Sequence, residues 1–464
     1  MTIATALVYL VAAVMFIIGL KFLSSPRGAR RGNLVAAAGM ALAVVWTLVL
    51  LRDKFTPAGI AISAVGFAIG AVAGTVGARN VKMTAMPQMV ALFNGVGGGA
   101  AALVAVSELL KQAGARPGFE TGFPSIFAII IGGVSFAGSG IAFAKLQELM
   151  TGTPITYPGQ QVVNGLIAAA LVALAVVVLA LTGEPPVLVA MLALALVLGV
   201  AFVLPIGGAD MPVVISLLNA CTGLAVAASG FVLDNFALIV AGTLVGASGT
   251  LLTKLMSDAM GRSLGNVLFG AFGQVRVAAG GGAGADGRSA RAGSSDDIGT
   301  MLAYARSVII VPGYGLAVAQ AQHVVRELAD QLEKRGVEVN YAIHPVAGRM
   351  PGHMNVLLAE ANVPYEQLRE MDAINGDFKR ADVALVVGAN DVVNPAARNS
   401  PGSPIYGMPI LNADEAKTVV FLKRSMRPGF AGIDNDLLYD PKTIMLFGDA
   451  KESLSHLVAA VKAA

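Results

Sequence analysis

Cysteine, histidine and charge are all scarce in this sequence of 464 residues. The single cysteine, Cys221, excludes a disulfide within the chain, and its place inside an apolar run predicts a packed small side chain. Only 13% of the residues are charged, whereas 56% are hydrophobic, which is far from the composition of soluble proteins. The net charge of +3 is too small to indicate a nucleic-acid partner. The composition therefore predicts a membrane protein.

The four histidines show where the chain changes character, because all of them follow residue 256, whereas nearly every long apolar run precedes it. A membrane helix needs about 20 apolar residues. We predict nine such spans, and we interpret the first as a helix rather than a secretion signal because no basic residue precedes it. The spans are 3–22, 34–51, 60–77, 89–110, 124–143, 163–182, 187–205, 211–232 and 236–256.

Lysine and arginine in the short connections predict the orientation of these spans. Nine of them fall on the side of the C-terminus and four on the other side. Because the cytoplasmic side carries the excess, we expect a multi-pass protein with its C-terminal domain in the cytoplasm. An odd number of spans then places the N-terminus outside.

Glycines recur at every fourth position in several spans, which predicts helices that pack closely in one bundle. They are Gly66, Gly70 and Gly74; Gly95 and Gly99; and Gly242 and Gly246.

A segment rich in Gly, Ala and Ser follows the spans, and its composition predicts a flexible linker at 261–300. From 301 to 464, strand-like and helix-like patterns alternate, which is typical of a doubly wound parallel sheet. The expected strands are 307–311, 337–343, 383–387, 418–422 and 443–447, with helices at 316–335 and 452–462. The predicted fold is a polytopic α-helical membrane bundle of about nine spans (1–260) followed by a soluble Rossmann-like α/β domain with a parallel sheet (301–464).

The first predicted strand leads into Gly313-Tyr314-Gly315 and a helix, which is the context of a dinucleotide fingerprint. Glycines there let the backbone approach a pyrophosphate, and the helix start offers free N–H groups. Val318 stands where the fingerprint has its third glycine or alanine. This motif by itself therefore leaves a tight strand-to-helix turn as the alternative.

The second predicted strand ends without the Asp or Glu that would hold a ribose 2′-hydroxyl, so a 2′-phosphate would be tolerated. Lys423, Arg424 and Ser425, at the end of a later strand, suit such a phosphate, although a solvated strand end is the alternative. Two further loops follow strands where ligands bind in sheets of this kind. They are Gly388-Ala389-Asn390-Asp391 and Gly448-Asp449-Ala450-Lys451.

Polar residues within the predicted spans are candidates for a transport pathway. Serine and threonine can instead satisfy carbonyls of their own helix, so Asn94 and Asn219 are the stronger candidates. Asp210 stands at the start of a span, where a helix cap is the alternative. The full set in the spans is Asn94, Ser139, Asn164, Asn219, Thr222 and Ser248.

Residues 344–355 (HPVAGRMPGHMN), taken with the glycine, Lys423-Arg424 and strand-end motifs, resemble the NADP(H)-binding domain of proton-translocating NAD(P) transhydrogenase. The likeness runs through residues 207–212 (GGADMP) and most spans, and so covers nearly the whole chain. It implies an NADP(H) site on this chain and no metal site. The residues implied are Gly313, Tyr314, Gly315, Val346, Ala347, Gly348, Arg349, Met350, Pro351, Gly388, Ala389, Asn390, Asp391, Lys423, Arg424, Ser425, Gly429, Phe430, Asp449 and Ala450.

The resemblance also implies roles in catalysis and proton movement for Asp391, Asn94, Ser139, Asp210 and Asn219. Asp391 would be the proton-sensitive group near the nicotinamide. Phe430 lies in the implied lid, where many members have tyrosine. Asn94 takes the place of a proton-transferring histidine of some members, and no histidine lies in any span. The titrating group must therefore lie elsewhere, for instance on a partner chain.

The implied activity is that of a Re/Si-specific transhydrogenase, in which protons moving inward drive hydride transfer from NADH to NADP⁺. Because the chain has one glycine fingerprint, NAD(H) is expected on a separate alpha subunit, in a dimer of heteromers within the lipid of a bacterial inner membrane. The alternative is a transporter or channel regulated by dinucleotide binding, which would bind nucleotide without transferring hydride. An inert membrane scaffold would leave Lys423 and Arg424 unexplained.

Overall fold

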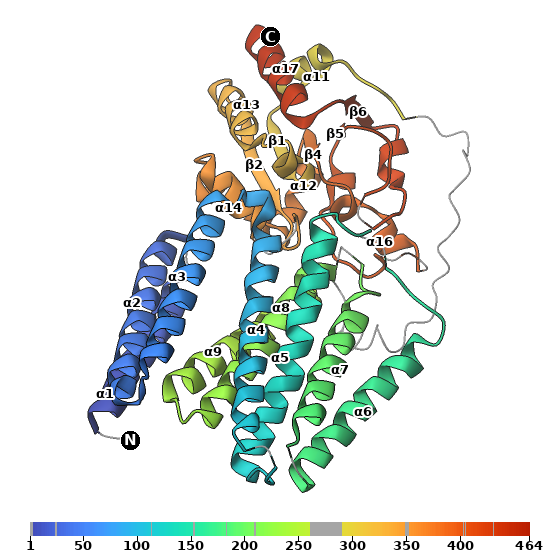
Figure 1. Cartoon of the computed structure of the whole chain (residues 1–464). Coiled ribbons are helices and arrows are strands. Elements are labelled where there is room, and N and C mark those ends of the chain that lie inside the picture. Colours follow the sequence, from blue (N-terminus) through green and yellow to red (C-terminus); the bar gives the residue numbers. More distant parts are fainter. Residues whose placement is uncertain are drawn as a thin grey trace.

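The computed structural model describes residues 3–23, 26–112, 114–151, 154–181, 183–207, 210–259, 290–348, 352–401, 403, 405–429 and 431–464. Within these residues, nine helices are long and apolar enough to cross a membrane, which confirms the predicted number (Figure 1). They are α1 Ile3–Leu23, α2 Pro26–Leu51, α3 Pro57–Asn80, α4 Met86–Leu110, α5 Phe119–Leu146, α6 Gln160–Ala180, α7 Pro185–Val203, α8 Met211–Val232 and α9 Phe236–Ala259.

Small residues bring helices of the bundle together at two of the three predicted places. A Cβ added to Gly242 would lie 2.4 Å from the backbone nitrogen of Ala227, so α8 and α9 pack backbone to backbone. A Cβ on Gly95 would lie 3.2 Å from the Cβ of Ser139, which places α4 directly against α5. These contacts confirm the close packing expected there.

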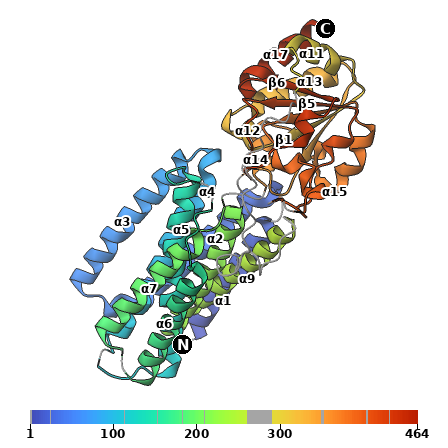
Figure 2. The same ribbon diagram turned by 90° about the vertical axis from the view of Figure 1, so that its right-hand side faces the viewer.

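The prediction for the third group of glycines is wrong within the described residues. A Cβ at Gly66, Gly70 or Gly74 would meet nothing within 4 Å. The physical reason is that α3 has no buried residue and stands apart from the other helices along most of its length (Figure 2).

The C-terminal part contains a six-stranded parallel sheet of order β3-β2-β1-β4-β5-β6. Its strands are β1 Ser307–Pro312, β2 Glu338–Ile343, β3 Leu368–Glu370, β4 Val383–Val387, β5 Thr418–Lys423 and β6 Thr443–Phe447. The five predicted strands and the Rossmann-like fold are confirmed. The edge strand β3 was missed because three residues are too short to show a period.

One predicted helix and the predicted linker differ from their expected bounds. The expected helix 316–335 is divided into α12 Tyr314–Val318 and α13 Gln322–Lys334. Gln320 adopts a φ of 49°, and the amide of Ala321 bonds back to the carbonyl of Leu316, which is how many helices end. Helix α11 covers Ser295–Ala303, so the end of the predicted linker is folded, while residues 260–289 lie outside the described residues.

The remaining helices are short, apart from the C-terminal one. They are α14 His353–Glu360, α15 Met371–Ile374, α16 Ala396–Asn399 and α17 Ala450–Ala463, with 3-10 turns η1 Arg52–Lys54, η2 Met83–Ala85, η4 Tyr365–Gln367, η5 Asn375–Arg380, η6 Asp391–Val393, η7 Ala413–Glu415 and η8 Asp436–Tyr439.

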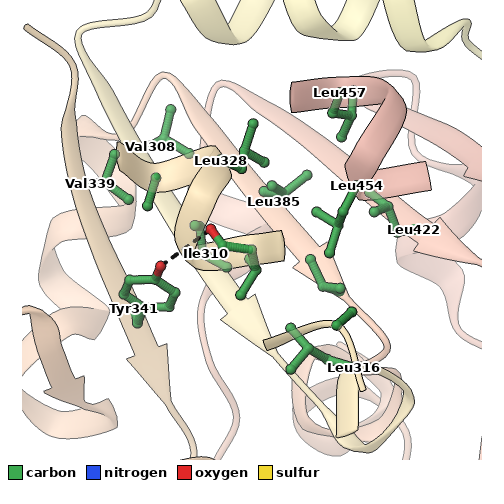
Figure 3. Close-up of a cluster of buried hydrophobic side chains, with 14 of the residues drawn as sticks. Val308, Ile310, Leu316, Leu328, Val339, Tyr341, Leu385, Leu422, Leu454 and Leu457 are labelled. Carbon is green, nitrogen blue, oxygen red and sulfur yellow. Dashed lines mark hydrogen bonds between the residues drawn. The ribbon is translucent and has the colours of Figure 1, made fainter. Parts of the chain in front are cut away.

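The sheet is covered on both faces, which explains why its central strands are almost continuously apolar. On one face, Ile310 and Leu385 point toward Leu328 of α13 and Leu454 of α17 (Figure 3). A second buried cluster, which includes Phe378 and Phe421, covers the other face. The packed sheet holds the carboxyl ends of its strands in fixed relative positions.

Candidate functional site

The candidate site begins where the strand order reverses, between β1 and β4. At this edge the backbone amides of Gly313 and Gly315 donate to the carbonyls of Val387 and Gly388, each at 2.9 Å. A Cβ on Gly313 would lie 2.4 Å from the Cα of Ala389, so only glycine allows the two loops to approach. The close approach of the loops therefore pairs the amides of these two glycines with the chain that follows β4.

A cavity of about 400 Å³ opens beside these loops, within the size range of small-molecule sites. The predicted residues that line it are Gly313, Tyr314, Gly315, Val346, Ala347, Gly348, Gly388, Ala389, Asn390, Asp391, Lys423, Arg424, Gly429 and Ala450. Ser425 and Asp449 do not line the cavity, although they adjoin Arg424 and Ala450. Arg349, Met350, Pro351 and Phe430 lie outside the described residues.

Sequence reasoning missed several apolar residues of the cavity wall. Ile405 and Met408 come from the chain between α16 and β5, and Val392 follows Asp391. An irregular loop has no hydrophobic period that would mark such residues. Pro212, in the first turn of α8, also lines the cavity, which brings the membrane bundle to its edge.

Two cations stand at the end of β5 with different partners. The ammonium of Lys423 donates to Oδ1 of Asn390 at 2.9 Å, and Arg424 pairs with Asp449. Burial lowers the pKa of Lys423, and the negative charges of Asp391 and Asp434 oppose that shift. The end of β5 therefore presents positive charge to the cavity.

Asp391 is held between two donors. Its Oδ1 accepts from the amide of Asn390, and its Oδ2 accepts from the backbone N–H of Ala431, both at 2.9 Å. A Cβ on Gly429 would lie 2.5 Å from Oδ1, so both Gly429 and Ala431 lie close to this carboxylate. Asp391 thus ties the predicted lid segment to the end of β4.

His344 shapes the loop that follows β2. Its Nε2 lies 2.8 Å from the carbonyl of Pro409, and the backbone N–H of Val346 donates to its Nδ1 at 3.2 Å. These bonds require a neutral ring protonated on Nε2. Burial lowers the pKa of His344 to about 4, against the effect of the bond to Pro409. A neutral histidine therefore sets the course of the backbone at 346–348.

In the bundle, Asn94 joins a polar cluster between α4, α5 and α8. Its amide donates to the hydroxyls of Ser139 at 2.9 Å and Ser135 at 3.3 Å. The hydroxyls of Ser135 and Thr222 lie 2.6 Å apart. Oδ1 of Asn94 is buried and accepts no hydrogen bond from the described residues. Ser135, a small polar residue on a helix, was missed because nothing in the sequence shows that it faces Asn94.

The other polar candidates lie outside this cluster. Asn219 is half-buried on α8, one turn from Thr222, and Asp210 stands at the N-cap position of α8 without a side-chain capping bond. Asn164 accepts from the hydroxyl of Tyr157 at 3.0 Å. Ser248 is exposed and bonds to a carbonyl of its own helix. The structure thus brings together Asn94, Ser139 and Thr222 only.

The cavity loops and the bundle meet at one apolar contact. Val346 packs against a buried cluster that includes Leu146, Ile206, Met211 and Met256, from α5, the connection between α7 and α8, and the ends of α8 and α9. A change in the loop after β2 would therefore alter the packing of this cluster, which includes the start of α8.

Together these features define a polytopic membrane protein with a Rossmann-like domain at one end of its bundle. A family model described as "NAD(P) transhydrogenase beta subunit" matches residues 5–460. Two curated proteins of Rhodospirillum rubrum, one from a named strain, are called NAD(P) transhydrogenase subunit beta. Each is 50% identical over 464 residues, covering 98% of this chain and 99% of the relative. The chain belongs to the NAD(P) transhydrogenase beta-subunit family.

Proposed function

We propose that this chain binds NADP(H) in the cavity at the carboxyl ends of β1, β2, β4 and β5, and couples inward proton movement to hydride transfer from NADH to NADP⁺. The observation that supports it most is the meeting of glycine backbone and two cations in one cavity. Gly313 and Gly388 line the cavity where the fingerprint would place a pyrophosphate, and Lys423 and Arg424 suit a 2′-phosphate. The residues present therefore fit the nucleotide.

The absence of a carboxylate after β2 supports NADP(H) over NAD(H). The strand ends at Ile343 and continues into His344, so no carboxylate directly follows it to hold a ribose 2′-hydroxyl, and the cations that we assign to the 2′-phosphate stand at the end of β5, beyond β1 and β4. We assign Val346, Ala347 and Gly348 to the pyrophosphate, together with Arg349, Met350 and Pro351, on the family resemblance. When bound, the nicotinamide supplies the hydride chemistry.

The chain's own contribution is positioning, exclusion of water and control of exchange. Asp391 holds the amide of Ala431, so closing or opening of the lid at 429–432 is tied to the state of this carboxylate. Loss of its charge would weaken the bond to the lid. Asp391 is therefore the residue through which we expect a proton to alter nucleotide release.

Nucleotide binding to the purified full-length chain tests this assignment. We expect NADPH to bind much more tightly than NADH, and the Lys423→Ala/Arg424→Ala variant to lose that preference. Lys379→Ala/Arg380→Ala removes two exposed cations away from the cavity and serves as the matched control. Equal binding of the two nucleotides by the unmodified chain would contradict the proposal.

We propose further that Asn94, Ser135, Ser139 and Thr222 form part of a proton path through the bundle. A buried oxygen of Asn94 with no donor suits a water molecule, which can carry a proton along hydroxyls that both donate and accept. Asp210 and Asn219 would continue the path on α8. One charge crossing 100 mV supplies about 2.3 kcal/mol, enough to shift a conformational equilibrium substantially.

The second nucleotide is proposed to lie on a partner. The family name implies an alpha subunit, and we assign NAD(H) to it, in an inner membrane with the sheet domain in the cytoplasm. Reconstitution of the chain with that subunit in vesicles tests the whole function. Proton uptake that accompanies hydride transfer supports it, whereas NADPH binding with no hydride transfer would favour a nucleotide-regulated transporter.

A further inference from the structure

Lys145 is a buried cation of the bundle that has no part in the cavity or the polar cluster. It lies in the last turn of α5, and only 2% of its surface is exposed. Its ammonium donates to the carbonyl of Leu204 at 2.5 Å and to that of Ile206 at 2.8 Å. A buried charge in a membrane protein is costly and is usually retained for function.

The partners of Lys145 are backbone carbonyls rather than a carboxylate. Leu204 is the C-cap of α7, where carbonyls lack partners within the helix and the helix dipole is negative. The ion pairs formed among the described residues do not include Lys145. The side chain therefore fixes the backbone that leaves α7, and no other side chain of the described residues shares its charge in an ion pair.

That backbone is the connection between α7 and α8. The carbonyl of Leu204 also accepts from the amide of Ile155 at 3.1 Å, so three segments meet at one point. Asp210 stands four residues after Ile206 in the sequence, and α8 begins at Met211. Ile206 and Met211 belong to the apolar cluster against which Val346 packs. Lys145 thus holds a segment that contributes Ile206 to the apolar cluster against which Val346 of the cavity loop packs.

Helix α5 also connects Lys145 to the polar cluster around Asn94. Ser135 and Ser139 lie on the same helix, α5, and bond to Asn94. Because a helix moves as a rigid element over such a length, a displacement at Ser139 is carried to Lys145. From Lys145 it reaches the connection between α7 and α8 through two hydrogen bonds.

We propose that Lys145 is a positioning residue that couples the polar cluster of α5 to the nucleotide cavity, by fixing the connection between α7 and α8, whose Ile206 belongs to the apolar cluster that Val346 packs against. This role rests on the proposed function, since it presumes that proton movement and nucleotide state are linked. The role of Lys145 goes beyond the proposed function because it assigns the link between proton movement and nucleotide state to a residue that contacts neither the nucleotide nor Asn94.

The test uses the chain assembled with its NAD(H)-binding subunit in sealed vesicles. Hydride transfer is measured with and without an imposed proton gradient, and NADPH binding is measured on the same preparation. We expect Lys145→Met to lower the stimulation by the gradient about tenfold, a typical size for coupling between two sites. NADPH binding and hydride transfer without the gradient should stay as in the unmodified complex.

Two variants serve as comparisons. Lys145→Arg keeps a cation with several donors and should restore most of the stimulation by the gradient. If Lys145 only filled space, restoring the positive charge in Lys145→Arg would not restore the stimulation that Lys145→Met loses. Lys254→Met removes an exposed lysine of α9 and should change nothing. Lys145→Gln, which keeps a donor without charge, provides the comparison if the methionine variant does not assemble.

The outcomes separate the two proposals. Normal stimulation in Lys145→Met, beside a stimulated unmodified complex, overturns the role of Lys145 alone. An equal loss of NADPH binding, of hydride transfer without the gradient and of stimulation also overturns it, because the residue would then be structural. An unmodified complex that is not stimulated by a gradient overturns the proposed function itself, and the role of Lys145 with it.

Discussion

Arg424 and Asp449 form an ion pair across the ends of β5 and β6, with Nη2 of the arginine 2.9 Å from Oδ2 of the aspartate. The side chains are 64% and 40% exposed, so the pair contributes little to stability. The carboxylate of Asp449 is therefore paired with Arg424, which is one of the two cations that we assign to the 2′-phosphate. A phosphate arriving at Arg424 must share or displace this carboxylate.

We predict that Asp449→Asn binds NADPH more tightly than the unmodified chain. An exposed ion pair is worth up to about 1 kcal/mol, so the gain in affinity should be at most about fivefold. Asp449 also caps α17 by accepting from the amide of Lys451, and asparagine keeps this cap. Titration calorimetry with NADPH measures the change, and Asp414→Asn, which frees the distant Arg398, is the control. Weaker binding in Asp449→Asn would show that the carboxylate itself contacts the nucleotide.

Replacing Asp391 should release the lid segment. Asp391→Ala removes the acceptor for the backbone N–H of Ala431, and a hydrogen bond to a charged group is worth about 1.5–3 kcal/mol. We therefore expect NADPH to dissociate at least about tenfold faster, as measured by stopped-flow fluorescence. Asp377→Ala, which removes a carboxylate outside the cavity, should leave the rate unchanged. An unaltered rate in Asp391→Ala would mean that the lid is not held through this bond.

The lowered pKa of His344 predicts that the folded chain is less stable in acid. This pKa is about 4 in the folded chain, whereas the ordinary value is 6.5. Between these two pH values the unfolded chain therefore binds a proton at His344 that the folded chain does not bind. The free energy of unfolding should therefore fall as pH drops from 6.5 toward 4, by up to about 3 kcal/mol from this group. Thermal unfolding followed by circular dichroism in this pH range, compared with His344→Gln, isolates the contribution. The glutamine variant should be less stable at neutral pH but less sensitive to acid; parallel pH curves would contradict the assignment.

Asn94→Leu should separate stability from proton movement. The substitution removes a buried oxygen that has no donor, and Ser139 can turn its hydroxyl to a carbonyl of its own helix. The melting temperature should therefore change little, whereas proton uptake coupled to hydride transfer should be lost. Asn164→Leu, on α6, removes a buried amide outside the cluster and serves as the control for proton uptake. Coupled uptake that survives Asn94→Leu would exclude the cluster as the path.

Gly313→Ala should destroy the junction of β1 and β4. The added methyl would meet the backbone of Ala389 at 2.4 Å, and such overpacking costs about 1–3 kcal/mol. NADPH binding should be lost together with part of the stability. At Gly376 a Cβ meets nothing within 4 Å, so Gly376→Ala is a matched control that should bind normally. Normal binding by Gly313→Ala would show that the two loops can separate without affecting the cavity.

Several features of the site could be predicted from sequence because they depend on local pattern. Strand ends follow from apolar runs, so the loops beginning at Gly388 and Lys423 were located correctly. Contacts between distant segments could not be predicted in this way. Ile405 and Met408 reach the cavity from one loop and Pro212 from the start of α8, and Ser135 faces Asn94 only because α4 and α5 cross closely.

By itself, the sequence determined the nine helices of membrane-spanning length among the described residues and the parallel-sheet domain, because span length and strand pattern depend on the solvent that each residue meets. Tertiary structure alone decided that Gly66, Gly70 and Gly74 pack against nothing in the described chain, that the amides of Gly313 and Gly315 are already paired, and that Lys145 lies buried on the carbonyls of Leu204 and Ile206. The physical reason is that a residue type limits which bonds a side chain can make, whereas the partner that satisfies them depends on which helices and loops come into contact.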